Sequence, residues 1–190
     1  MHVFDFVVIL NSFIYALALS HLLSRIGALL LAPERVKFSG LTTLMAVNAV
    51  WATIFCWLGL WQLHTLPDWD MATILSQFFL AIALYFLAVF AAPEGSENRT
   101  IDTEAFYWAQ HRRFYWTYII ADIIGILGNV AYLRSADPAL FLKWNLASLP
   151  MFLPSILALT VRARWAQWTA GIGLLIITVG VVLPIEAQLT

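Results

Sequence analysis

The run MATILSQFFLAIALYFLAVFAA, residues Met71–Ala92, contains no charged side chain. An α-helix rises about 1.5 Å per residue, so roughly 20 apolar residues cross a bilayer core of about 30 Å. This run therefore predicts a transmembrane helix. Five further apolar stretches divide the rest of the chain: Phe4–Leu31, Leu41–Leu66, Phe114–Leu133, Ala139–Val161 and Trp165–Leu183. We expect an all-α, polytopic integral membrane protein with six transmembrane helices.

The composition favours the same class. Of 190 residues, 62% are hydrophobic and 11% are charged, whereas soluble domains carry about 25% charged residues. Six spans leave only short connectors and one longer loop, so we expect a single transmembrane domain over residues 1–190. A net charge of -1 without a basic tract argues against nucleic acid as a partner. The expected partners are the lipid bilayer of the cell (inner) membrane, a second copy of the chain and other membrane proteins.

Positive charges fall mainly in alternate connectors. Of the ten Lys and Arg residues, seven lie in the first, third and fifth connectors: Arg35, Lys37, Arg99, Arg112, Arg113, Arg162 and Arg164. Only Arg134 lies in an even-numbered connector. Cytoplasmic connectors of membrane proteins are enriched in Lys and Arg. The odd connectors are therefore predicted to face the cytoplasm, with the N-terminus and the C-terminus both outside.

The third connector, residues 93–113, is the only long one, and we expect it to carry an interfacial helix. Asp102 is a suitable N-cap for a helix that continues through Phe114 into the membrane. Aromatic and arginine side chains recur along this helix: Phe106, Tyr107, Trp108, Arg112, Arg113 and Trp116. Such side chains suit the headgroup level of a bilayer. They are interpreted as a lipid-interface anchor, and a specific anionic-lipid or partner site is the alternative.

Small residues recur at helical spacing in two stretches. The fourth contains Ala121 and Gly125, with Gly128 nearby, and the sixth contains Gly173 and Gly180. In lipid, small faces let helices approach closely and gain van der Waals contact. These residues predict packing seams between helices.

A few polar side chains lie inside the apolar stretches, where an ionisable group costs at least a few kcal/mol. The helical rise places one set at similar depth in the inner half of the membrane: His21, Arg25, Asn48 and Asp122. This set is a candidate buried polar layer or ion path. A second candidate polar group lies nearer the outer side: Asn11, Gln77, Lys143 and Asn145, with Asn129 as a further candidate.

Arg25 and Asp122 could pair, because either charge alone would be costlier in hydrocarbon. Alternatively, the first span ends near Ser24 and Arg25 reaches lipid phosphate, while Asp122 is protonated or bonded to a polar neighbour. Lys143 lies only about one helical turn from the start of the fifth apolar stretch, so we expect its side chain to reach the outer headgroups.

The sequence predicts no catalytic residues, no metal site and no cofactor. It contains neither a Gly-x-Ser-x-Gly nor a His-Glu-x-x-His motif. A b-type haem needs two histidines on facing helices at matched depth, and His21 and His64 lie in opposite halves of the membrane. Cys56 is interpreted as a small buried hydrophobe.

Two functions fit these observations. The favoured one is a membrane-embedded structural, sensor or partner-binding component without catalytic chemistry. The alternative is permeation or transport of protons, ions or a small solute through a polar layer around Asp122, His21 and Arg25.

Overall fold

The computed structural model describes residues 3–65, 69–95, 100–130, 142, 145–146 and 148–186. These residues confirm an all-α chain with six α-helices: α1 (Val3–Leu31), α2 (Gly40–Gly59), α3 (Met71–Ala91), α4 (Thr103–Gly128), α7 (Phe152–Thr160) and α8 (Arg164–Glu186). Three of them, α1, α2 and α3, are long and apolar enough to cross a membrane. The beginning of the predicted fifth span, residues 139–141, and the candidate Lys143 lie outside the described residues.

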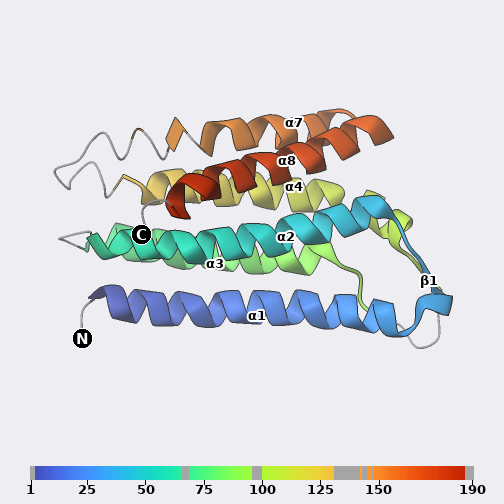
Figure 1. The fold of residues 1–190 in the computed structure, drawn as a ribbon, viewed down its shortest axis with the longest axis horizontal. Coiled ribbons are helices and arrows are strands. Elements are labelled where there is room, and N and C mark those ends of the chain that lie inside the picture. The colour runs from blue at the N-terminus through green and yellow to red at the C-terminus, as the bar shows by residue number, and fades with distance from the viewer. Residues whose placement is uncertain are drawn as a thin grey trace.

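The helices lie side by side and alternate in direction (Figure 1). α1 forms one edge, α2 and α3 follow, then α4 and α8, and α7 lies at the opposite edge. α3 packs against both α1 and α4, while α2 packs against α8. The start of α1 and the end of α8 lie at the same end of the bundle, so the odd connectors meet at the other end (Figure 1).

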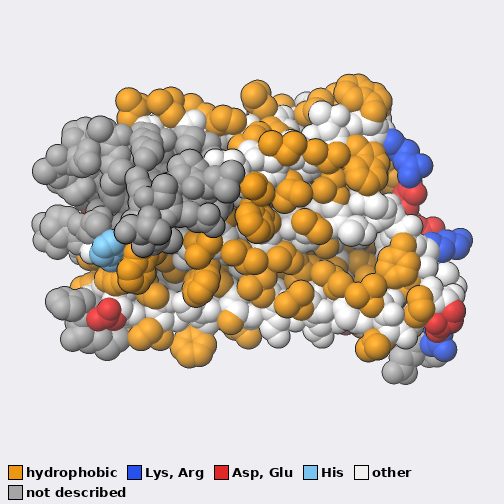
Figure 2. Space-filling model, in the orientation of Figure 1, with side chains coloured by type: hydrophobic (Ala, Val, Ile, Leu, Met, Phe, Trp, Pro, Cys, Tyr) orange, Lys and Arg blue, Asp and Glu red, His pale blue; other side chains and the backbone are white. Residues whose placement is uncertain are grey.

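The odd connectors are bound to one another at this second end. The strands β1 (Val36–Lys37) and β2 (Ile101–Asp102) pair in parallel, Val36 with Ile101 and Lys37 with Asp102. Arg164 at the start of α8 lies 3.2 Å from Glu104 at the start of α4. Figure 2 shows the Lys and Arg side chains of the visible face gathered at this end, beyond a broad hydrophobic surface. The bundle therefore has one distinctly charged end.

Asp102 is the N-cap of α4, which confirms the prediction. Its carboxylate accepts hydrogen bonds from Glu104 N at 3.0 Å and Ala105 N at 2.9 Å. The neighbouring Thr103 hydroxyl accepts from Ser39 N at 2.7 Å and donates to Lys37 O at 2.8 Å. The Asp102 contacts satisfy first-turn N–H groups of α4 that have no partner inside the helix, and the Thr103 contacts join the start of α4 to the first connector. From this start α4 continues without a break past Phe114.

Large apolar side chains point outward along the bundle. On α1, Phe6, Phe13 and Leu17 are more than half exposed, while Val7, Asn11, Tyr15, Ala18, Leu22 and Leu29 form the buried stripe. The buried positions recur every three or four residues, which is the spacing of one helical face. An outer surface of this kind is unfavourable in water, but in lipid it has no such cost.

Two predicted stretches differ from a continuous α-helix. The second changes at Gly59 into the 3₁₀ turn η2 (Leu60–Thr65), ahead of Pro67, which disfavours α-helical geometry in the residue before it. In the fifth stretch the 3₁₀ turn η3 (Leu149–Met151) precedes α7. Pro150 lies in this turn and has no backbone N–H to donate.

Helix α8 approaches α2 closely at Gly171. A methyl group on Gly171 would lie 2.5 Å from Cδ2 and 2.9 Å from Cγ of Leu44, whereas one on Gly180 would meet nothing within 4 Å. A methyl group on Gly173 would instead lie 3.5 Å from Cγ of Pro154 in α7. Of the two glycines predicted to mark seams in this helix, Gly173 packs against a neighbour and Gly180 does not. The glycine at the α2 seam is Gly171.

Replacing Gly171 with alanine should destabilise the bundle by about 1–3 kcal/mol, because the added methyl overlaps a branched side chain. Gly180→Ala on the same helix is the matched control and should change stability by no more than about 0.5 kcal/mol. Denaturant unfolding of both variants in the same micelle measures the difference. Equal effects of the two substitutions would show that α2 and α8 do not approach as described.

Candidate functional site

A polar cavity of about 140 Å³ lies between α2, α3, α4 and η3. Its polar lining residues come from three segments: Gln77 from α3, Tyr118, Asp122 and Asn129 from the α4 segment, and Ser148 beside η3. Apolar side chains form most of the remaining wall, and Cys56 of α2 is among them. The cavity therefore places a few polar groups in an otherwise apolar interior.

One face of α4 supplies most of the polar wall. Tyr118, Asp122, Gly125 and Asn129 are spaced by four, three and four residues, which aligns them along one side of a helix. A methyl group on Gly125 would meet nothing within 4 Å, so this position leaves the cavity open. Gly128 instead packs against α3, where an added methyl would lie 3.0 Å from Gln77 Nε2. Of the predicted small residues on α4, Gly128 therefore packs against α3 and Gly125 borders the cavity.

Asp122 is the ionisable group of this cavity. Its Oδ2 atom is buried and has no hydrogen-bond partner in the part of the chain that the structure describes. None of the described lining residues is Lys, Arg or His. A buried carboxylate without a partner is costly unless a proton or a bound group compensates it. Asp122 therefore has a buried oxygen atom that a proton or a bound group would stabilise.

The outer polar group contributes to the same cavity. Asn129 Nδ2 donates to Asn145 Oδ1 at 3.0 Å, and the Asn145 Nδ2 atom is buried without a described partner. Gln77 is buried on α3. The structure therefore brings Asp122 together with Gln77 and Asn129, which the depth estimate assigned to a separate group. Asn145 bonds to Asn129 but is not one of the residues that line the cavity.

Asn11, also predicted in the outer group, lies elsewhere. It is buried on α1, and its Nδ2 donates to Val7 O at 3.0 Å. Its Oδ1 has no hydrogen-bond partner among the described residues. Asn11 is not one of the residues that line the Asp122 cavity.

Arg25 and Asp122 form no ion pair within the described ranges. Arg25 Nη1 donates to Ala92 O at 2.9 Å, and Ala92 is the C-cap of α3. Carbonyls at a helix C-terminus have no partner inside the helix and attract cations. In addition, α2 and α3 lie between α1 and α4 (Figure 1). Arg25 therefore bonds to the end of α3 and does not pair with Asp122.

The other members of the predicted inner layer also lie apart from Asp122. The His21 ring lies 5.9 Å from the Tyr85 ring of α3, measured between centroids. Asn48 donates through Nδ2 to Leu44 O at 2.9 Å and to Gly171 O at 3.0 Å, so it joins α2 to α8. The residues predicted to form one inner layer therefore lie at separate places. Arg25 and His21 contact α3, Asn48 joins α2 to α8, and Asp122 lines the cavity.

The predicted interface anchor divides into exposed and buried members. Arg112, Arg113 and Trp116 are exposed, Phe106 and Trp108 are half-buried, and Tyr107 is only 1% exposed. Tyr107 points inward because its hydroxyl donates to Gln167 Oε1 at 2.7 Å. Tyr107 is therefore buried between helices, unlike the other five members of the predicted anchor.

Gln167, which the sequence analysis did not single out, completes this contact. Its Nε2 donates to Ala158 O at 3.0 Å and to Val161 O at 2.6 Å, and its side chain is fully buried. These bonds connect α4, the end of α7 and α8. In the sequence, Gln167 is an uncharged amide between Trp165 and Trp168 at the start of an apolar stretch. The same pattern suits a residue at the membrane surface, so it did not predict a buried contact.

His111 lies beside this contact, before the predicted span that begins at Phe114. Its ring stacks on Tyr107 with centroids 5.7 Å apart, and its Nδ1 lies 3.0 Å from Trp108 O. Burial lowers the pKa of His111 below its usual value, and the positive charges of Arg162 and Arg112 act in the same direction. The bond to Trp108 O opposes this shift without cancelling it. The buried ring is therefore held in its neutral form.

Lowering the pH should destabilise the protein partly through His111. Above about pH 6.5 a histidine is mostly neutral in both the folded and the unfolded protein. Below that pH the unfolded chain binds a proton more readily than the buried ring of the folded protein does, so the free energy of unfolding falls. His111→Phe keeps the stacked ring and removes the proton site, so its loss of stability between pH 7 and pH 5 should be smaller. Thermal unfolding at both pH values measures this. His64→Phe, at an exposed position, is the control, and an unchanged pH profile in His111→Phe would contradict the assignment.

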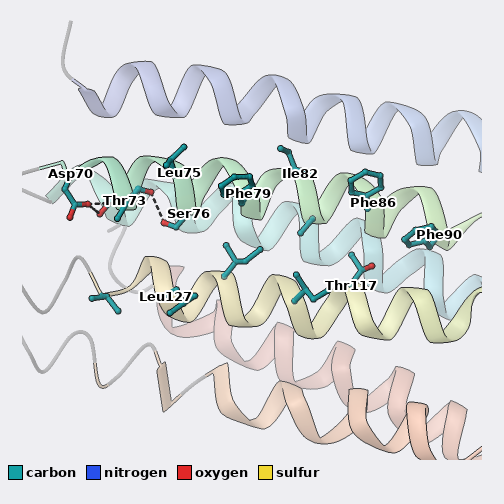
Figure 3. Close-up of a pocket in the computed structure, with 15 residues that line it drawn as sticks. Asp70, Thr73, Leu75, Ser76, Phe79, Ile82, Phe86, Phe90, Thr117 and Leu127 are labelled. Atoms are coloured by element: carbon teal, nitrogen blue, oxygen red, sulfur yellow. Dashed lines mark hydrogen bonds between the residues drawn. The ribbon is translucent and has the colours of Figure 1, made fainter.

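A second, wider hollow of about 820 Å³ lies between α3 and α4 on the outside of the bundle. Figure 3 shows Phe79, Phe86 and Phe90 of α3 along it, facing Thr117 and Leu127 of α4. At one end the Asp70 carboxylate accepts from Thr73 N at 2.8 Å, and Ser76 Oγ donates to Thr73 O at 2.8 Å. The Asp70 and Ser76 side chains at this end are thus bonded within the first turns of α3, and the apolar walls of the hollow suit lipid chains.

Within the described residues, no group of three or more His, Cys, Asp or Glu side chains could hold a metal ion. No family model, curated protein or solved structure matches this chain. The cavity around Asp122 is therefore the candidate site on its geometry alone.

Proposed function

We propose that this chain is a six-span protein of the cell (inner) membrane, with both termini outside, that acts as a membrane-embedded binding component without catalytic chemistry. It would serve as a sensor or as a partner-binding subunit. The observation that carries the proposal is the polar cavity at Asp122, which holds an unpartnered carboxylate oxygen in an apolar bundle. A buried polar group inside a membrane helix is expensive and usually serves a function.

The arrangement of the helices supports the proposed orientation. The first, third and fifth connectors lie at one end of the bundle (Figure 1). Arg35 and Lys37 lie in the first of these connectors, and Arg162 lies in the last. Because basic residues favour the cytoplasmic side, this charged end would face the cytoplasm.

The separation of the polar residues favours binding over permeation. Arg25 binds the end of α3, and Asn48 joins α2 to α8. Neither residue lines the cavity at Asp122. In the described part of the chain, the predicted inner layer therefore does not form one continuous path.

Permeation remains a second candidate because of one feature. The polar face of α4 extends from Asp122 to Asn129, and Asn129 continues the hydrogen bonding to Asn145. A row of polar groups along a helix could conduct a proton or a small ion if an oligomer completed the lining.

A reporter fused after Thr190 tests the orientation. Alkaline phosphatase, which is active only outside the cytoplasm, should be active at this position, and a fluorescent protein that matures only in the cytoplasm should stay dark. Fusions after Ser96, in the third connector, should give the opposite pattern because the two sites lie on opposite sides in this topology. Cytoplasmic activity at Thr190 would overturn the orientation.

Flux measurements decide between binding and permeation. Liposomes that contain the purified protein should hold a pH or potassium gradient as well as protein-free liposomes do, because no continuous polar path joins the described polar groups. The contrary result has three parts: the gradient dissipates, Asp122→Asn abolishes the leak, and Glu94→Gln in the exposed loop does not. That result would show that permeation is the function and that the binding proposal is wrong.

A further inference from the structure

We infer that the cavity at Asp122 binds a small organic primary ammonium compound, with the ammonium group at the carboxylate and its apolar part against α2 and α3. The inference rests on the proposed binding role and adds the chemical class of the ligand. It is argued from the charge, the hydrogen-bonding groups and the walls of the cavity.

When Asp122 is ionised, the cavity carries one negative charge, which one positive charge would balance. Asp122 is the only carboxylate among its described lining residues, and none of them is Lys, Arg or His. A carboxylate in an apolar interior is stabilised by a cation that bonds to it directly. One univalent cation balances one carboxylate, whereas a divalent ion would leave excess charge and would need more oxygen ligands.

The hydrogen-bonding groups match a primary ammonium. Such a group has three N–H donors and no acceptor. The cavity is lined by Asp122, whose Oδ2 has no described partner, and by Gln77 and Asn129, whose side chains each carry an amide oxygen that can accept a hydrogen bond. The Asn129 amide nitrogen already donates to Asn145, so its oxygen is the atom that remains for a ligand. Three acceptor side chains therefore meet three donors.

The walls favour an organic cation over an inorganic one. Leu80, Leu84 and Leu87 of α3 line the cavity, and so do Ala52 and Phe55 of α2. Binding sites for small molecules commonly combine apolar walls with a few polar groups that fix orientation. The volume of about 140 Å³ corresponds to roughly four or five waters at about 30 Å³ each. This space suits an amine with a short alkyl chain, which would contact walls that a bare ion cannot.

Titration calorimetry and thermal unfolding of the full-length protein in nanodiscs at pH 7.5 test the inference. The probe is n-butylammonium chloride, which should bind saturably and raise the unfolding temperature. Three probes serve as controls: tetramethylammonium has the charge without N–H donors, 1-butanol has the chain without the charge, and sodium or potassium chloride supplies an inorganic cation at equal ionic strength. Each should bind at least tenfold more weakly.

Two variants locate the site. Asp122→Asn keeps the size of the side chain and removes its charge, so n-butylammonium affinity should fall at least tenfold. Gly125→Leu would place a side chain in the open part of the cavity, since nothing lies within 4 Å of the added methyl position, and should block binding while Asp122 stays in place. Glu94→Gln, in the exposed loop after α3, should bind as the unmodified protein does. If Asp122→Asn does not fold, Gly125→Leu decides the question.

Several outcomes would overturn the inference: no saturable response to n-butylammonium, an equal response to sodium or potassium, or unchanged affinity in a folded Asp122→Asn or Gly125→Leu variant. These failures leave the proposed binding role standing and remove only the ligand class. A gradient leak that depends on Asp122 would instead overturn the proposed function itself.

Discussion

The apolar outer surface of the bundle is the constraint on which the rest of this structure depends. Side chains such as Phe13 and Leu17 are more than half exposed, which is favourable where the surrounding solvent is also apolar. In such a solvent the backbone must satisfy its own hydrogen bonds, so long helices follow. Burial of apolar surface then contributes little to holding the helices together, and the contacts between them must rest on close packing and on polar bonds.

The described structure shows both kinds of contact. Gly171 allows α8 to approach Leu44 of α2, and its carbonyl accepts from Asn48 at the same place. Tyr107 and Gln167 join α4 to α8 near the charged end, and Gln167 also binds carbonyls at the end of α7. Further along the same two helices the Tyr118 and Thr178 hydroxyls lie 3.3 Å apart. Interhelical bonds of this type contribute about 0.6 kcal/mol on average, so several are needed.

The polar groups inside the bundle divide according to whether a neighbour satisfies them. Asn48 and Gln167 are bonded to backbone carbonyls, and Arg25 binds the C-cap of α3; these groups serve the fold. Asp122 has a carboxylate oxygen with no described partner and faces a cavity. An ionisable group left in this state is the feature that packing alone does not explain, and it is the basis of the binding role proposed for the protein.

The sequence by itself determined the all-α class, the three long apolar helices α1, α2 and α3 and the N-cap at Asp102, because apolar length and capping chemistry are local properties of the chain. It also identified Asp122, Gln77 and Asn129 as polar residues in apolar stretches. Only the tertiary structure decided which of them meet. Depth along a helix axis was computable from the residue rise, but rotation about the axis and the choice of neighbouring helix were not. Asp122 therefore joined Gln77 and Asn129 and not Arg25, because α2 and α3 lie between α1 and α4.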